Sequence, residues 1–183
     1  MQMIKSDLSN NSDLIAEVPT YMGEASIRLF AFGFLEMAEH SAGLAGNNTC
    51  SIDAVVPAIL YNIRHSVELF LKYILYDLKA ATDSDAILGH SVKRLYDDHI
   101  DTLEIALGCE PDSGFHHNEW LTRLQAVVYA IHEVDPDGQS LRYPANGNLI
   151  ANHGGGYRVS IYHIKRCIEE IKAVYSDFDL RSC

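Results

Sequence analysis

The sequence predicts an all-α protein, an antiparallel bundle of about five helices with a short irregular or hairpin insertion before the last one. Two observations support this fold class. Apolar residues recur every three or four positions in five segments, the spacing of helices with one buried face. Apolar residues also make up 48% of the 183 residues, enough for one domain with a substantial core. We therefore expect an N-terminal arm over residues 1–16 and one domain over residues 17–183.

The strongest helical pattern covers residues 57–79, where apolar side chains keep three-and-four spacing over several turns. These apolar residues are Ile59, Ile63, Val67, Phe70, Leu71, Ile74 and Leu78. A second stripe contains Arg64, Glu68 and Lys72, so opposite charges lie one turn apart on one face. A helix with this much apolar surface and a charged stripe is expected at the centre of the domain.

Four further segments show helical spacing. The first covers residues 19–42 and is apolar on nearly every side, which predicts a second buried surface. That surface is either a subunit interface or a packing surface within the domain itself. A loop is expected from Gly43, and the other helices are expected over residues 90–107, 119–133 and about 157–176.

The stretch before the last helix, residues 134–156, lacks helical spacing. It begins with a turn sequence, Asp135-Pro-Asp-Gly, and contains Asn146-Gly147, a hairpin signal between two short apolar pieces. Three glycines, residues 154–156, then precede the last helix. They either expose backbone N–H groups to a phosphate or form a flexible link.

The composition limits the classes of partner. A formal net charge of −11 repels a nucleic-acid backbone over most of the surface. Nucleic-acid chemistry would therefore need a local basic pocket, or one assembled between subunits. The chain shows no secretory signal and no apolar run of the ~20 residues that span a bilayer. We expect a cytoplasmic protein without membrane contact.

Patterns for metal and cofactor binding are missing from the sequence. The four cysteines are far apart and form no C-x-x-C pair, so we expect free thiols. His116 and His117 are adjacent but have no third ligand at a helical offset. No phosphate-binding loop, nucleophile elbow or H-E-x-x-H motif occurs. The sequence predicts no metal and no cofactor.

Two arginines are each followed five positions later by a histidine, in the pairs Arg94/His99 and Arg158/His163. An arginine can hold a phosphate, and a histidine near its ordinary pKa can move a proton. Together they suit attack of an RNA 2′-hydroxyl on the adjacent phosphate without a metal. Two aspartates interrupt the first pair and would repel phosphate, whereas the second pair begins a helix whose dipole favours an anion. We therefore take Arg158 and His163 as the candidate catalytic residues.

Three pieces of the chain carry a family resemblance over about residues 55–175. They are Arg64-His65-x-x-Glu68-Leu-x-Leu-Lys72, Gly89-His90-x-x-Lys93-x-Leu95, and Asp135-Pro-Asp-Gly-Gln-Ser-Leu-Arg142-Tyr143-Pro144. In this order and spacing they resemble prokaryotic HEPN-type domains, the "higher eukaryotes and prokaryotes nucleotide-binding" family. The resemblance implies an antiparallel helical bundle, usually dimeric, and many such proteins are toxins or phage-defence proteins.

Active members of that family are metal-independent ribonucleases whose arginine and histidine, separated by four to six residues, meet their symmetry mates across the dimer. The resemblance thus implies a homodimer that acts on RNA. Arg158 would bind the scissile phosphate, and His163 would act as general acid and base. A toxin of this kind also implies an antitoxin or another partner protein.

Members with the Arg-Tyr-Pro piece often lack the catalytic pair, which implies an alternative, a catalytically silent module that binds a nucleotide or RNA or mediates dimerisation. The candidate binding residues are then Arg142, Tyr143, Arg64, His65 and Glu68. Arg142 would meet phosphate and Tyr143 would stack on a base. The other interpretation is structural, with Arg142 reaching Glu68 as a clamp inside the bundle.

Overall fold

The computed structural model describes residues 24–78, 89–108, 116–136, 138, 141 and 159–180. These residues form six helices and no strand. The helices are α1 (Glu24–Gly46), α2 (Ile52–Asp77), α3 (Val92–Asp97), α4 (Ile100–Gly108), α5 (His117–Val134) and α6 (Ile161–Leu180). The prediction of an all-α helical bundle is confirmed.

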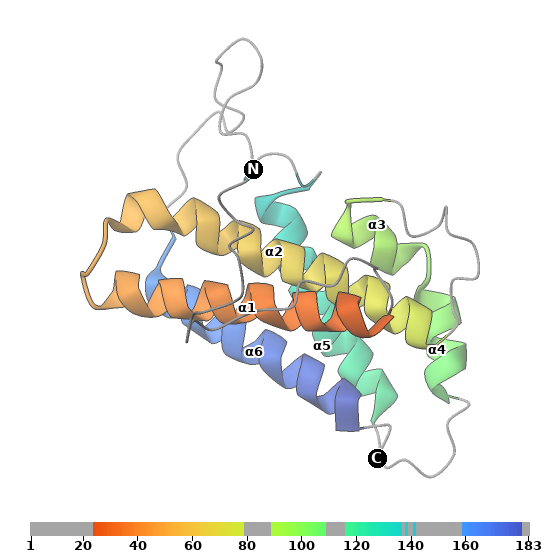
Figure 1. The fold of residues 1–183 in the computed structure, drawn as a ribbon. Helices are drawn as coiled ribbons and strands as arrows, with labels where there is room; N and C mark the ends of the chain where they lie inside the picture. Colours follow the sequence, from red (N-terminus) through yellow and green to blue (C-terminus); the bar gives the residue numbers. More distant parts are fainter. Residues whose placement is uncertain are drawn as a thin grey trace, which may run out of the picture.

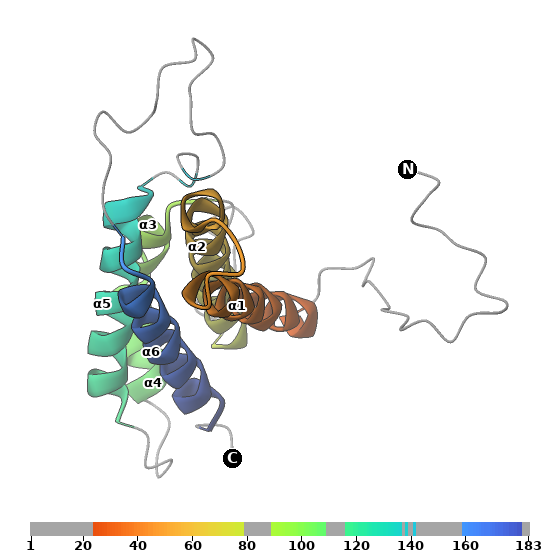
Figure 2. The same cartoon turned by 90° about the vertical axis from the view of Figure 1, so that its left-hand side faces the viewer.

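The helices are arranged as two antiparallel pairs with two short helices added (Figure 1). One pair consists of α1 and α2, and the other consists of α5 and α6. Helix α6 runs beneath α1 in this view. The view turned by 90° shows α1 and α2 on one side and α5 and α6 on the other (Figure 2). Helix α3 contacts both α2 and α5, and α4 contacts α5. No helix of the described residues is both long and apolar enough to cross a membrane.

Helix α2 is the central element, as predicted, because it contacts α1, α3 and α6. Its apolar stripe is buried in the core, except for Leu78, which is partly buried. An aromatic cluster joins it to α6, with the rings of Phe70 and Tyr175 stacked at a centroid distance of 3.8 Å. Helix α5 joins the same cluster through Trp120, whose indole Nε1 donates to the Val174 carbonyl at 2.8 Å.

Helix α1 extends beyond its predicted end, so the expected loop from Gly43 is wrong. Ala42 and Ala45 are both fully buried, and the helix continues to Gly46 because its small residues still pack there. The helix then ends at a turn with Asn48 at φ 55°, where the Thr49 hydroxyl donates to the Leu44 carbonyl at 2.7 Å.

The predicted single helix over residues 90–107 is also wrong, because it is divided into α3 and α4. His99 Nδ1 bonds to the Leu95 carbonyl at 3.0 Å, which a continuous helix would use for the backbone N–H of residue 99. That N–H instead bonds to the Tyr96 carbonyl at 3.2 Å, which tightens the chain into a turn. A histidine side chain thus replaces one backbone hydrogen bond at the division.

Helix α1 carries apolar residues on its outer surface as well as toward the core. Ile27, Ala31 and Leu35 are buried, whereas Leu29 is 61% exposed and Met37 is 57% exposed. The excess of apolar residues noted in the sequence therefore lies on both sides of α1. A subunit interface on the outer side stays a prediction. The predicted arm, the predicted hairpin, Arg142, Tyr143 and Arg158 lie outside the described residues.

Candidate functional site

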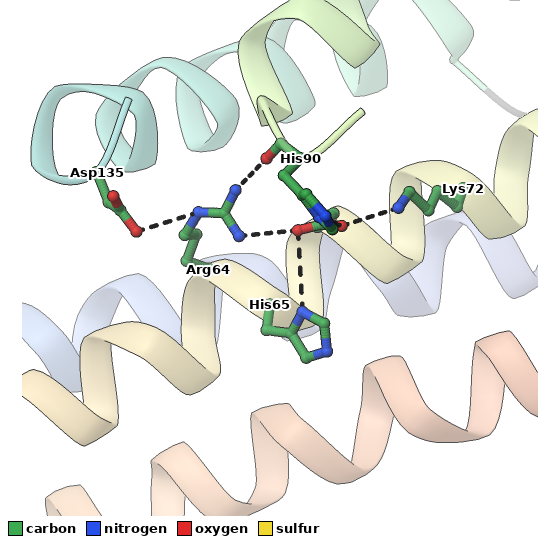
Figure 3. A network of polar contacts seen from close by, with 6 residues as sticks. Arg64, His65, Lys72, His90 and Asp135 are labelled. Atoms are coloured by element: carbon green, nitrogen blue, oxygen red, sulfur yellow. Dashed lines mark hydrogen bonds and ion pairs between the residues drawn. The ribbon is translucent and has the colours of Figure 1, made fainter. Parts of the chain in front are cut away.

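A buried ionic network surrounds Arg64, whose side chain is only 1% exposed. Its Nη1 donates to Glu68 Oε2 at 2.8 Å, and its Nη2 donates to the backbone carbonyl of His90. Its Nε lies 3.3 Å from Asp135 Oδ2, at the end of α5 (Figure 3). The guanidinium therefore connects α2, the segment before α3, and the end of α5.

Glu68 is the anion of this network and is also only 1% exposed. Its Oε1 accepts from Lys72 Nζ at 2.8 Å and from His90 Nδ1 at 3.0 Å. Burial alone would raise the pKa of Glu68, but His65 at 3.9 Å and the bonded donors of Lys72 and Arg64 outweigh it and hold the pKa well below its ordinary value. Glu68 is therefore ionised at neutral pH, and the predicted pairing of Arg64, Glu68 and Lys72 is confirmed.

Gly138 covers the guanidinium of Arg64 from the outside. A Cβ atom at this position would overlap Nη2 and Cζ of Arg64 and would lie 3.0 Å from Nη1. The backbone of Gly138 also has φ 75°, a conformation that residues with a Cβ rarely adopt. The turn after α5 thus needs a glycine both for its backbone and for its close approach to Arg64.

The three pieces of sequence that carry the family resemblance meet at this network. Arg64 and Glu68 come from the first piece, His90 from the second, and Asp135 from the third. Sequence spacing alone could not show this meeting, because 26 positions separate Arg64 from His90. The sequence marks these two residues only through their neighbours. His90 follows a glycine, and Asp135 begins the turn sequence Asp-Pro-Asp-Gly after a predicted helix.

The arrangement of Arg64, His65 and Glu68 favours a packing role over ligand binding. The charged ends of Arg64 and Glu68 are buried against partners within the chain. His65 lies between two rings, at centroid distances of 4.5 Å from Phe34 and 5.6 Å from Tyr61. The predicted contact between Arg142 and Glu68 stays a prediction, since Arg142 lies outside the described residues.

His163, the candidate catalytic histidine, lies on the exposed side of the first turn of α6. It lines an apolar cavity of about 190 Å³ together with Arg64, Leu141 and Cys167. The neighbouring Tyr162 is 66% exposed. The structure therefore brings His163 and Arg64 to one cavity and leaves His163 accessible from outside.

The other arginine–histidine pair, Arg94 and His99, lines a more polar pocket of about 430 Å³. His90, Ser91 and Asp98 line the same pocket. The two aspartates between Arg94 and His99 both have partners in the structure. Asp98 pairs with Arg94 at 3.1 Å, and Asp97 bonds to Lys93 and Tyr129. His90 was not among the predicted site residues, although it joins this pocket to the buried network.

Within the described residues, no group of three or more His, Cys, Asp or Glu side chains is placed to hold a metal ion. A scan against family models, a search of curated proteins and a search of solved structures each returned no match.

Proposed function

We propose that the chain is a HEPN-like, metal-independent endoribonuclease that acts as a homodimer in a toxin or phage-defence system. Arg158 binds the scissile phosphate, and His163 is the general acid and base. The observation that carries the proposal is the position of His163, exposed in the first turn of α6 and five positions after Arg158. The meeting of the three family-like pieces at Arg64 supports the same family.

The proposed reaction needs only these two groups from each copy. One His163 imidazole takes the proton of an RNA 2′-hydroxyl, and the oxygen attacks the adjacent phosphorus. The bond from phosphorus to the 5′-oxygen breaks, and the protonated His163 of the second copy gives a proton to that oxygen. Arg158 stabilises the extra negative charge on the phosphate oxygens. The products are a 2′,3′-cyclic phosphate end and a 5′-hydroxyl end.

The neighbourhood of His163 suits a contact between two copies. The end of α1 lies beside the beginning of α6. A Cβ atom added to Gly46 would lie 2.8 Å from Lys165 Nζ and 3.6 Å from Ile161 Cγ2. Leu44 and Tyr162, which belong to these two ends, are large apolar side chains exposed to solvent. A twofold contact here would also gather the cationic groups of both copies, which a chain with a net charge of −11 needs to hold RNA.

The test is cleavage of tRNA in the presence of EDTA. We expect the protein to cut tRNA and to leave 2′,3′-cyclic phosphate ends. His163→Ala should lower the rate by about 10²–10⁴-fold, the usual contribution of a general acid or base. The matched control is His40→Ala, because His40 is also exposed on a helix but lies on α1. Intact tRNA with the unmodified protein, or equal cleavage by His163→Ala, would contradict the proposal.

The second candidate is a silent HEPN-like module that binds a nucleotide, with Arg142 and Tyr143 as ligand contacts. The Arg-Tyr-Pro piece supports it, since members of the resembled family with that piece often lack the catalytic pair, and so does the net charge of −11. A thermal-shift series with nucleotides separates the two candidates. Stabilisation that Tyr143→Ala abolishes, without any cleavage of tRNA, would favour the silent module.

A further inference from the structure

The cavity at His163 has an almost entirely apolar wall, which is built from residues of α2, α5 and α6 and of the segments next to them. Ile63, Ile131 and Ile164, one from each of these helices, are buried and form its floor. Ala130 and His163 are exposed and lie at its mouth. The cavity therefore has a floor of isoleucines and opens to solvent beside the His163 imidazole.

The charged group in the wall of this cavity is already bonded within the chain. Arg64 lines the cavity, but its guanidinium donates to Glu68 and to the His90 carbonyl, and its Nε lies 3.3 Å from Asp135 Oδ2. Burial raises the pKa of the Cys167 thiol, so this lining side chain is uncharged at neutral pH. A phosphate group inside the cavity would lose its hydration without gaining a free cation from these residues, whereas an apolar group has no such cost.

The volume of the cavity limits the size of its ligand. A volume of about 190 Å³ lies below the range of drug-sized sites, which is about 300–1,000 Å³. An engineered cavity of about 150 Å³ with a similar aliphatic lining stays dry and binds benzene. The cavity at His163 therefore has room for an aliphatic chain of about six to eight carbons.

We propose that this cavity binds a small amphiphile through an aliphatic chain of about six to eight carbons. The chain lies against Ile63, Ile131 and Ile164, and its polar end stays in water at the mouth, beside His163. Removal of methylene groups from water supplies the affinity, with a gain of about fourfold for each buried methylene. Binding of such a ligand does not depend on the proposed ribonuclease activity, because no RNA takes part in it.

The test is a titration of the full chain with primary alcohols from 1-butanol to 1-decanol, followed in ¹H–¹³C spectra of the isoleucine methyl groups. Ile→Val variants assign the signals of Ile63, Ile131 and Ile164. We expect these signals to shift saturably, with an affinity that rises about fourfold per methylene and levels off near eight carbons. The control signal is that of Ile105, which is 67% exposed on α4 and should not shift. Unshifted floor signals, equal shifts at Ile105, or an affinity that still rises at 1-decanol would overturn the proposal.

A probe with a hydroxyl at each end tests how the chain lies in the cavity. 1,6-Hexanediol has the length of 1-hexanol, but it would place its second hydroxyl against the isoleucine floor. We expect it to bind at least about tenfold more weakly, because a hydroxyl buried among apolar side chains loses its hydrogen bonds to water. Equal affinity for the two probes would overturn the proposed orientation.

Two exposed alanines of α5 then separate this cavity from the rest of the apolar surface. Ala130→Leu enlarges a side chain at the mouth and should weaken 1-hexanol binding at least about tenfold, because the leucine takes space that the chain would fill. The matched control is Ala126→Leu, since Ala126 is also exposed on α5, one turn earlier, and does not line the cavity. Thermal unfolding confirms that both variants are folded. Equal weakening by the two variants, or none by Ala130→Leu, would overturn the site.

Discussion

Arg64 and Arg94 each face a carboxylate one helical turn later, and the two pairs differ in burial. Arg64 and Glu68 are each 1% exposed, at 2.8 Å from one another. Arg94 and Asp98 are 82% and 55% exposed, at 3.1 Å. The spacing in the sequence is the same, but the first pair is enclosed by the core and the second faces a pocket open to solvent.

The comparison shows why one pair holds the fold together and the other adds little to its stability. A buried charge needs partners within the chain, and Arg64 has Glu68, the His90 carbonyl and Asp135. An exposed pair is hydrated and screened, so it adds little to stability. Burial, rather than spacing, decides how much each pair contributes to stability.

The largest expected effect is that of Glu68→Ala. This change leaves Arg64 and Lys72 without their shared anion, and breaking a buried ion pair costs about 3–5 kcal/mol. The matched control is Asp98→Ala, which should change the free energy of unfolding by less than about 1 kcal/mol. Urea unfolding of both variants measures the difference. Similar losses for the two variants would contradict the contrast in burial.

Lowering the pH should also weaken this network, because it protonates Glu68. The loss of stability should be smaller than that of Glu68→Ala, since a protonated Glu68 still accepts hydrogen bonds. The pKa of Glu68 is lower in the folded chain than its ordinary value of 4.5, so the unfolded chain binds that proton more readily. Its contribution to stability is therefore complete above about pH 4.5 and is lost as the pH falls below that value. Unfolding midpoints across this range should fall less steeply for Glu68→Gln than for the unmodified protein. Parallel pH curves would contradict this assignment.

A smaller effect is expected from two glycine substitutions of opposite sign. Gly138→Ala places a Cβ against the Arg64 guanidinium and strains a backbone at φ 75°, which should destabilise the fold by about 1–3 kcal/mol. Gly33→Ala lies in α1 with nothing within 4 Å of the new Cβ, and it should stabilise by about 0.5–1 kcal/mol. Thermal unfolding checks both signs. A neutral Gly138→Ala would mean that Arg64 is not covered as described.

Much of the fold could be predicted because helical spacing is a local property. The burial of the apolar stripe on α2 and the pairing of Arg64, Glu68 and Lys72 both follow from positions three or four apart. The division between α3 and α4 could not be predicted in this way. It depends on the His99 ring, which bonds to the Leu95 carbonyl in place of a backbone N–H group. The pattern of apolar residues carries no information about that hydrogen bond.

The sites were harder to predict, since they depend on contacts between distant segments. Asp135 lies at the end of α5 and His90 lies before α3, yet both contact Arg64 on α2. Sequence spacing gave no distance between these residues. By contrast, His163 was singled out from a local pattern, and the structure places it on an accessible surface at the start of α6.

The most direct measurement of the contrast between the two pairs is a pair of double-mutant cycles, one for Arg64 and Glu68 and one for Arg94 and Asp98. Each cycle compares the free energies of unfolding of the two single alanine variants and the double variant. We expect a coupling of about 2 kcal/mol or more for the buried pair and about 0.5 kcal/mol or less for the exposed pair. Equal couplings, or the larger one at Arg94 and Asp98, would contradict the division between a buried network that holds the fold and an exposed pair that adds little to it.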